Sequence, residues 1–293
     1  MKAPAVPPDA AQRVRISAAA SAQSGAVQTR DISTAYRICG AGPWLVLSHS
    51  LACDHTMWEP QIETLARSFR VLAYDTRGHG RTSAPPGPYS LEMLAADLKA
   101  LLDALAIDRC HFVGLSMGGM IGQTFALAYP GVLRSMVLCD TSSGFPPGTD
   151  AAWEARVRQA TEGGMSSVVA PTLERWFTPE THRSRPDVLA AFARQIEATP
   201  TEGYTACSRA LVKVDTTARL NELDLPVLML VGARDIGTPV SMARVIHEGI
   251  RGSELAVIDG AAHFPNIERT AAFDEVLLDF LGRHAAPLST ETP

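Results

Sequence analysis

Apolar and polar positions alternate in blocks along most of this chain, from about residue 27 onward. Short apolar runs, which predict strands, are separated by amphipathic segments with helical spacing. Strands that alternate with helices are typical of βαβ units in a mostly parallel sheet. Because the runs are continuously apolar, we expect both faces of each strand to be buried. The predicted strands are 44–48, 71–75, 111–114, 136–140, 226–231 and 255–258.

Two of the amphipathic segments carry helix-start signals. Ser90 is a candidate N-cap, and leucines recur at helical spacing from Leu94 to Leu105 after it. Near the end of the chain, Thr270 is expected to open a last helix that ends near Gly282. Each segment gathers its apolar residues on one face, so both helices are expected to pack against the core.

The alternation of strands and helices is interrupted between about residues 142 and 223, where helical segments dominate at 153–161, 186–196 and 201–212. We therefore predict an α/β fold with a mostly parallel central sheet flanked by helices. Its core is formed by 27–141 and 224–284, and a helical cap is inserted at 142–223. Residues 1–26, rich in Ala, Ser and Pro, are expected to form a flexible N-terminal tail, and 285–293 a C-terminal tail.

Composition narrows the class of partner. The net charge of −5 and the lack of a block of basic residues argue against nucleic acid and anionic membranes as binding partners. Small molecules are therefore the expected partners. Prolines and charges interrupt the N-terminal segment, so we expect neither a signal peptide nor a membrane span. The 5 cysteines form no metal-ligand pattern, and their odd number favours a reducing compartment, the cytoplasm, with no metal site.

The predicted strand at 111–114 runs into the motif Gly114-Leu115-Ser116-Met117-Gly118 and then into an apolar helical segment. A turn this tight strains the backbone of its serine and needs glycines where a Cβ would clash. Ser116 is therefore the candidate nucleophile. Its hydroxyl needs a neutral imidazole to accept the proton and an acid to orient that imidazole.

Two later loops supply these groups. Asp235 follows the predicted strand 226–231, and His263 follows the strand 255–258. Reactive groups in open parallel sheets gather at the carboxyl ends of strands, and the order Ser, Asp, His is that of an α/β-hydrolase triad. Each residue alone has an ordinary explanation as turn or solvated loop, whereas together they predict a catalytic triad. Asp140 is the competing acid, and His79 is expected to be structural.

Hydrolysis through a tetrahedral intermediate also needs donors for the oxyanion. The backbone N–H of Met117, directly after the nucleophile, is one predicted donor, and Leu51 in the loop 48–53 is the other. Aromatic and imidazole side chains near these loops are candidates for enclosing the substrate, although the tryptophans could equally pack the core. The predicted substrate contacts are His49, Trp58 and Trp176.

These residues and the order of elements around them resemble the α/β-hydrolase family from about residue 27 to 284. A narrower resemblance is to 3-oxoadipate enol-lactonases, which usually have Asn-Ser-Leu-Gly where this chain has His49-Ser50-Leu51-Ala52. The resemblance implies the α/β-hydrolase fold and assigns Ser116 as nucleophile, Asp235 as acid and His263 as base. The segments that carry it are 47–51, 57–58, 74–80, 87–91, 114–119, 176–179 and 202–204.

The resemblance implies hydrolysis of an enol-lactone in bacterial aromatic catabolism, with no metal or organic cofactor. Three other kinds of enzyme use the same triad: general carboxylesterases, cofactor-free perhydrolases or haloperoxidases, and carbon–carbon bond hydrolases. A ligand receptor on a hydrolase scaffold is the non-enzymatic alternative. Dehalogenases and epoxide hydrolases are disfavoured, because those relatives need a carboxylate where Ser116 stands.

Overall fold

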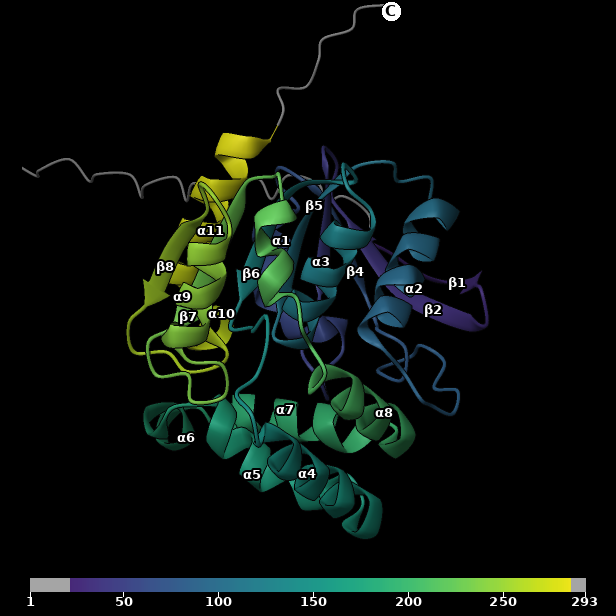
Figure 1. Ribbon diagram of the computed structural model, residues 1–293, viewed down its shortest axis with the longest axis vertical. Helices are drawn as coiled ribbons and strands as arrows, with labels where there is room; N and C mark the ends of the chain where they lie inside the picture. The colour runs from purple at the N-terminus through teal and green to yellow at the C-terminus, as the bar shows by residue number, and fades with distance from the viewer. Residues whose placement is uncertain (1–21, 286–293) are drawn as a thin grey trace, which may run out of the picture.

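The computed structural model describes residues 22–285, which contain an eight-stranded sheet in the order β1-β2-β4-β3-β5-β6-β7-β8 (Figure 1). Strands β3 to β8 run parallel, whereas β2 pairs antiparallel with both β1 and β4. The predicted mostly parallel sheet is confirmed. The strands are β1 Gln23–Thr29, β2 Ile32–Cys39, β3 Trp44–Ser48, β4 Arg70–Tyr74, β5 Cys110–Leu115, β6 Leu133–Cys139, β7 Val227–Gly232 and β8 Glu254–Ile258.

The sequence analysis missed the first two strands. β1 alternates exposed and partly buried positions, and its many polar residues give no continuous apolar run. It forms a hairpin with β2, in which Thr29 pairs with Ile32 at the turn. The flexible tail predicted for 1–26 is therefore wrong for Gln23–Ala26, which are held by the hydrogen bonds of this ladder. Most of both predicted tails, namely 1–21 and 286–293, lies outside the described residues.

The burial prediction holds for β3, β5, β6 and β7, which are buried along nearly their whole length. It is wrong for β8, where Val257 is 41% exposed. The reason is topological, since β8 pairs only with β7 and closes one edge of the sheet. All five cysteines are free and buried, as is usual for small apolar side chains.

Helices cover the sheet. Helix α2 packs against α3, and α1 packs against α11. Ser90 caps α2 as predicted, because its hydroxyl accepts a hydrogen bond from the Met93 amide at 3.1 Å. Among the residues described here, no helix has both the length and the apolar character to cross a bilayer. These helices are α1 Glu59–Leu65, α2 Leu91–Ala104, α3 Met117–Ala128, α9 Val240–Gly249, α10 Pro265–Glu268 and α11 Thr270–His284.

Between β6 and β7 the chain forms helices that lie together beyond one end of the sheet, at the bottom of Figure 1. The three helical segments predicted in this region are present. The division of the chain into core and cap at 142 and 223 stays a prediction. The helices are α4 Thr149–Gly163, α5 Ser166–Trp176, α6 Pro179–Ser184, α7 Pro186–Ala198 and α8 Thr201–Leu211, and short 3-10 helices lie at His55–Trp58 (η1) and Thr217–Glu222 (η2).

Candidate active site

Ser116 lies at the turn between β5 and α3 with φ 55° and ψ −111°, in the left-handed region that non-glycine residues rarely occupy. Its amide donates to the Cys139 carbonyl at 2.9 Å, and the Thr141 hydroxyl donates to its carbonyl at 2.8 Å. A Cβ on Gly118 would lie 2.3 Å from the Ser48 carbonyl oxygen, so only glycine lets α3 approach β3 this closely. The strained backbone of Ser116 is thus held by hydrogen bonds to the end of β6 and to the loop that follows it.

His263 and Asp235 form a buried hydrogen-bonded pair, with 2.8 Å between the imidazole Nδ1 and the carboxylate Oδ2. The carboxylate also accepts from the Gly237 amide at 2.8 Å and the Thr238 hydroxyl at 2.7 Å. Burial opposes ionisation of Asp235, but the charge and hydrogen bond of His263 outweigh it and hold the pKa of Asp235 at about 2. An ionised Asp235 keeps the Nδ1 proton on His263 and leaves Nε2 to accept a proton.

Asp140, the competing acid, lies close to this pair. Its Oδ1 accepts from the Gly232 amide at 2.9 Å, and ligand atoms of Asp140, Asp235 and His263 lie within 4.8 Å of one another. Burial, and then the neighbouring charge of Asp235, raise the pKa of Asp140 well above its usual range. Both causes disfavour the anion of Asp140, whereas the carboxylate that contacts His263 belongs to Asp235.

Of the two predicted oxyanion donors, Leu51 shares a cavity with the nucleophile and Met117 directly follows it in the chain. Leu51 lines the same cavity as Ser116 and His263, while the side chain of Met117 is fully buried. Met117 is the first residue of α3, and the first amides of a helix have no partner within it and carry partial positive charge. Its backbone can thus serve an oxyanion even though its side chain faces the core.

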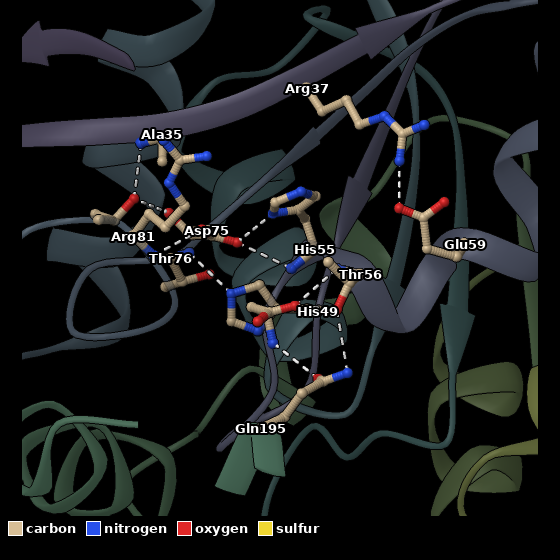
Figure 2. A network of polar contacts seen from close by, with 12 residues as sticks. Ala35, Arg37, His49, His55, Thr56, Glu59, Asp75, Thr76, Arg81 and Gln195 are labelled. Carbon is tan, nitrogen blue, oxygen red and sulfur yellow. Dashed lines mark hydrogen bonds and ion pairs between the residues drawn. The ribbon is translucent and has the colours of Figure 1, made fainter. Parts of the chain in front are cut away.

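His49 does not line the cavity, which corrects its predicted role in substrate contact. Its ring is fully buried; Nδ1 donates to the Ser50 carbonyl at 2.7 Å, and Nε2 accepts from the Thr76 amide at 2.8 Å. The ring thereby ties the loop that contains Leu51 to the loop after β4, as Figure 2 shows. Burial is the main cause that lowers the pKa of His49 and keeps this ring neutral.

The same network contains a second acid–imidazole pair, His55 and Asp75 (Figure 2). The ring and amide nitrogens of His55 both donate to Asp75 Oδ1, at 2.7 and 2.9 Å. Burial disfavours charge on both groups, but their mutual attraction raises the pKa of His55 and holds that of Asp75 at about 2. His79 is buried nearby with a pKa lowered to about 3, mainly by burial, so its predicted structural role agrees with its position.

Of the two predicted tryptophan contacts, the structure brings only Trp176 to the site. Trp176 lines the cavity and stacks on His263, with ring centroids 6.4 Å apart and planes at 22°. Trp58 is completely buried and packs near Phe273, with centroids 6.5 Å apart. It belongs to the core instead, because the apolar side of η1 faces α11 rather than the cavity.

The cavity that joins these groups has a volume of about 290 Å³ and lies between the carboxyl ends of the strands and helices α4, α5 and α8. This size suits a small molecule. Sequence reasoning missed two of its lining residues, Arg156 and Arg175. Each arginine is close in sequence to a tryptophan on the same helix: Arg156 follows Trp153 by three residues, and Arg175 directly precedes Trp176. This proximity is the sequence signal that could have identified them.

Two groups of side chains in the described residues have carboxylate and imidazole atoms close enough to hold a cation: Asp54, His55 and Asp75, and Asp140, Asp235 and His263. In both groups the imidazole is hydrogen-bonded to a carboxylate of the same group. These hydrogen bonds account for the close approach without a metal ion.

Comparison with known proteins gives the family of this chain and several relatives. A family model described as the alpha/beta hydrolase fold matches residues 43–270. The chain is 34% identical over 250 residues to 3-oxoadipate enol-lactonase 2 of Acinetobacter baylyi, covering 85% of this chain and 92% of that protein. It is 31% identical over 245 residues to a protein of Agrobacterium fabrum named as a provisional carbamate hydrolase, covering 82% and 93%.

Among solved structures, the enol-lactonase of Burkholderia xenovorans LB400 superimposes with a TM-score of 0.85 at 35% identity. That comparison covers 88% of this chain and 100% of the lactonase. The predicted fold and the resemblance to enol-lactonases are confirmed by these relatives. These relatives support the assignment of this chain as an ester or lactone hydrolase.

Proposed function

This chain belongs to the α/β-hydrolase family, and on that premise we propose that it cleaves a carboxylic ester or lactone through an acyl-enzyme on Ser116. The observation that carries the proposal is one cavity lined by Ser116 and His263, with His263 hydrogen-bonded to the ionised Asp235 at 2.8 Å. A hydroxyl nucleophile, an imidazole base and an orienting carboxylate are the three groups that acyl transfer requires.

In the first half-reaction, His263 Nε2 takes the proton of the Ser116 hydroxyl as its oxygen attacks the substrate carbonyl. The backbone N–H groups of Leu51 and Met117 stabilise the resulting oxyanion, and Asp235 stabilises the imidazolium. His263 then returns its proton to the leaving oxygen as the carbon–oxygen bond breaks. In the second half-reaction, His263 activates a water that attacks the acyl-enzyme and releases Ser116.

For the substrate, an enol-lactone of the kind named in the curated and solved relatives is the best-supported choice. In that case the leaving oxygen is an enol, which relaxes to a ketone after release and favours the forward reaction. Acyclic esters, carbamates, peroxide-dependent acyl transfer and carbon–carbon cleavage use the same groups and are the rival reactions. The 5 buried free cysteines favour a reducing compartment, the cytoplasm, as the place of the reaction.

The test is a substrate panel of a lactone, an acyclic ester, a carbamate, a diketone and acetate with peroxide, run on wild type and Ser116→Ala. We expect Ser116→Ala to lower turnover by at least about 10³-fold for every substrate that the wild type accepts. A fluorophosphonate probe should label wild type at Ser116 and leave the variant unlabelled. Full activity of a folded variant would exclude Ser116 as the nucleophile.

The same panel separates the enzyme from a binding protein. A receptor on this scaffold would bind the lactone without turnover, and its serine would not react with the fluorophosphonate. A lactone hydrolysed with higher kcat/KM than its acyclic ester supports the lactonase assignment. The reverse order would assign a carboxylesterase.

A further inference from the structure

The loop that carries the imidazole base, residues 259–264 and here called the base loop, is hydrogen-bonded to the helices between β6 and β7. The His263 amide donates to the Trp176 carbonyl at 3.1 Å, and the rings of these two residues stack with centroids 6.4 Å apart. Trp176 is the last residue of α5 and lines the active-site cavity. The backbone of His263 is therefore held by a helix that also forms part of the cavity wall.

A second connection between the same two segments runs through the carboxylate of Glu268, the last residue of α10. Its Oε2 accepts from the amide of Ala262, directly before His263, at 2.6 Å. Its Oε1 accepts three hydrogen bonds at the start of α6: from the Thr178 amide at 2.8 Å, the Thr178 hydroxyl at 2.7 Å and the Thr181 hydroxyl at 2.6 Å. The two oxygens thus bridge the base loop and the start of α6.

This bridge suits a carboxylate better than any other side chain. An ionised carboxylate has two acceptor oxygens and no donor, which matches the four donors that point at Glu268. Its partners Ala262, Thr178 and Thr181 are buried, and Glu268 itself is half-buried. An amide of the same shape would turn an NH₂ group toward one end of the bridge and leave a buried donor there unpaired, which is costly.

The position of the base loop matters because proton transfer depends on short distances. The hydrogen bond to Asp235 sets the tautomer of the His263 ring, but Nε2 must also lie within hydrogen-bond reach of the Ser116 hydroxyl. A displacement of about 1 Å at a reacting group costs on the order of 10²-fold in rate. Movement of the base loop would therefore lower the rate even where the triad hydrogen bond persists.

We propose that Glu268 is a positioning residue for the base: it holds the base loop against the start of α6 and thereby places His263 Nε2 toward Ser116. This inference rests on the proposed hydrolysis at Ser116. Glu268 does not line the cavity, so its effect on the reaction passes through His263 rather than through contact with the substrate. The helices between β6 and β7 then set the position of the base as well as one wall of the cavity.

The first test is steady-state kinetics of Glu268→Gln on an activated ester. kcat should fall by roughly 10- to 100-fold, because one end of the bridge is lost, whereas KM should change less than about threefold. Labelling of Ser116 by a fluorophosphonate should slow by a similar factor, since it needs the same base. A loss carried by KM alone would overturn the proposal, because Glu268 would then only shape the cavity.

Glu180→Gln is the matched control. Glu180 on α6 forms an exposed ion pair at 3.7 Å with Arg269, the residue after Glu268, so the substitution removes a carboxylate between the same segments without touching the base loop. It should leave kcat and the labelling rate within about twofold of wild type. Equal effects of Glu180→Gln and Glu268→Gln would overturn the proposed role while leaving ester hydrolysis intact.

Thr181 gives a second test if Glu268→Gln does not fold. Thr181→Val removes one donor to Glu268 and should lower kcat by about two- to fivefold, whereas Thr181→Ser keeps the hydroxyl and should match wild type. In a Glu268→Ala background, Thr181→Val should cause no further loss, because its partner is already absent. Additive losses in the double variant would contradict an effect that passes through Glu268.

Nitrogen NMR of the imidazole keeps the proposal testable if no ester is cleaved. The ring ¹⁵N resonances of His263, assigned by their absence in His263→Gln, should shift in Glu268→Gln and stay unchanged in Glu180→Gln. That result supports the positioning role even if hydrolysis at Ser116 fails. Where an ester is cleaved, kcat decides; where none is cleaved, unchanged resonances in Glu268→Gln overturn the proposal.

Discussion

At the scale of single residues, the pKa values of two buried carboxyl groups at the site shift in opposite directions because their surroundings differ. Asp235 receives hydrogen bonds from His263, Gly237 and Thr238, which stabilise its anion. Asp140 has one amide donor, from Gly232, and faces the negative charge of Asp235. Both acids were predicted at the ends of strands, with Asp235 favoured. Only the contacts in the folded chain distinguish the carboxylate that orients His263 from the neighbouring acid, whose pKa is raised.

Substitution of each acid by asparagine separates these roles. Asp235→Asn should lower kcat by about 10³- to 10⁴-fold with little change in KM, because an amide no longer holds the imidazole in the required tautomer. Asp140→Asn keeps an Oδ1 acceptor for the Gly232 amide and does not touch the hydrogen bond between His263 and Asp235, so kcat should stay within about tenfold. Steady-state kinetics on an activated ester gives both values. A larger loss for Asp140→Asn would make Asp140 the orienting acid.

At the scale of elements, the contact between α8 and the loop after β4 decides how the helices sit over the site. Gly203 on α8 lies directly against Gly78, and a Cβ on Gly203 would fall 2.0 Å from the Gly78 carbonyl oxygen. The next residue, Tyr204, lines the cavity. A helix pattern in the sequence predicts that α8 exists, whereas this backbone contact determines where it lies.

Gly203→Ala should destabilise the protein by about 1–3 kcal/mol, because the added methyl meets backbone that cannot move aside. It should also raise KM by displacing Tyr204. Gly282 offers the matched control: it lies exposed in α11, and nothing lies within 4 Å of a Cβ built there. Gly282→Ala should leave KM unchanged and stabilise by up to about 1 kcal/mol through helix propensity. Urea unfolding and steady-state KM measurements on both variants test these predictions. Equal changes in stability for Gly203→Ala and Gly282→Ala would contradict the proposed role of the Gly203 contact.

At the scale of the whole molecule, buried neutral histidines link folding to pH. Burial is the main cause that lowers the pKa of His79 to about 3 and that of His111 to about 4. Between these values and the unfolded pKa of about 6.5, the unfolded chain binds more protons than the folded one. The contribution of these two histidines to the free energy of unfolding is therefore fully present above about pH 6.5 and is lost progressively as the pH falls toward 4.

His111→Phe tests this link away from the catalytic loops, since His111 lies on β5 with its Nδ1 2.8 Å from the Ser135 hydroxyl and its ring against Phe69. The variant should lose less unfolding free energy than wild type between pH 6.5 and 4, by on the order of 1 kcal/mol. Urea titrations at several pH values measure both slopes. Identical slopes would show that protonation of His111 does not contribute.

The sequence by itself determined the features whose signals are local. Continuous apolar runs predicted the inner strands, the Gly-x-Ser-x-Gly turn singled out Ser116, and the strand-end positions singled out Asp235 and His263.

The tertiary structure alone decided which distant side chains meet in the cavity. It removed His49 and Trp58, because both are enclosed by neighbours from other segments. Arg156 and Arg175 joined the residues that line the cavity, because the packing of α4 and α5 brings side chains from two separate helices to the same cavity. The hydrophobic pattern of a strand or helix depends on residues that are neighbours along the chain. Which side chains meet in a cavity depends instead on the packing of segments far apart in the sequence.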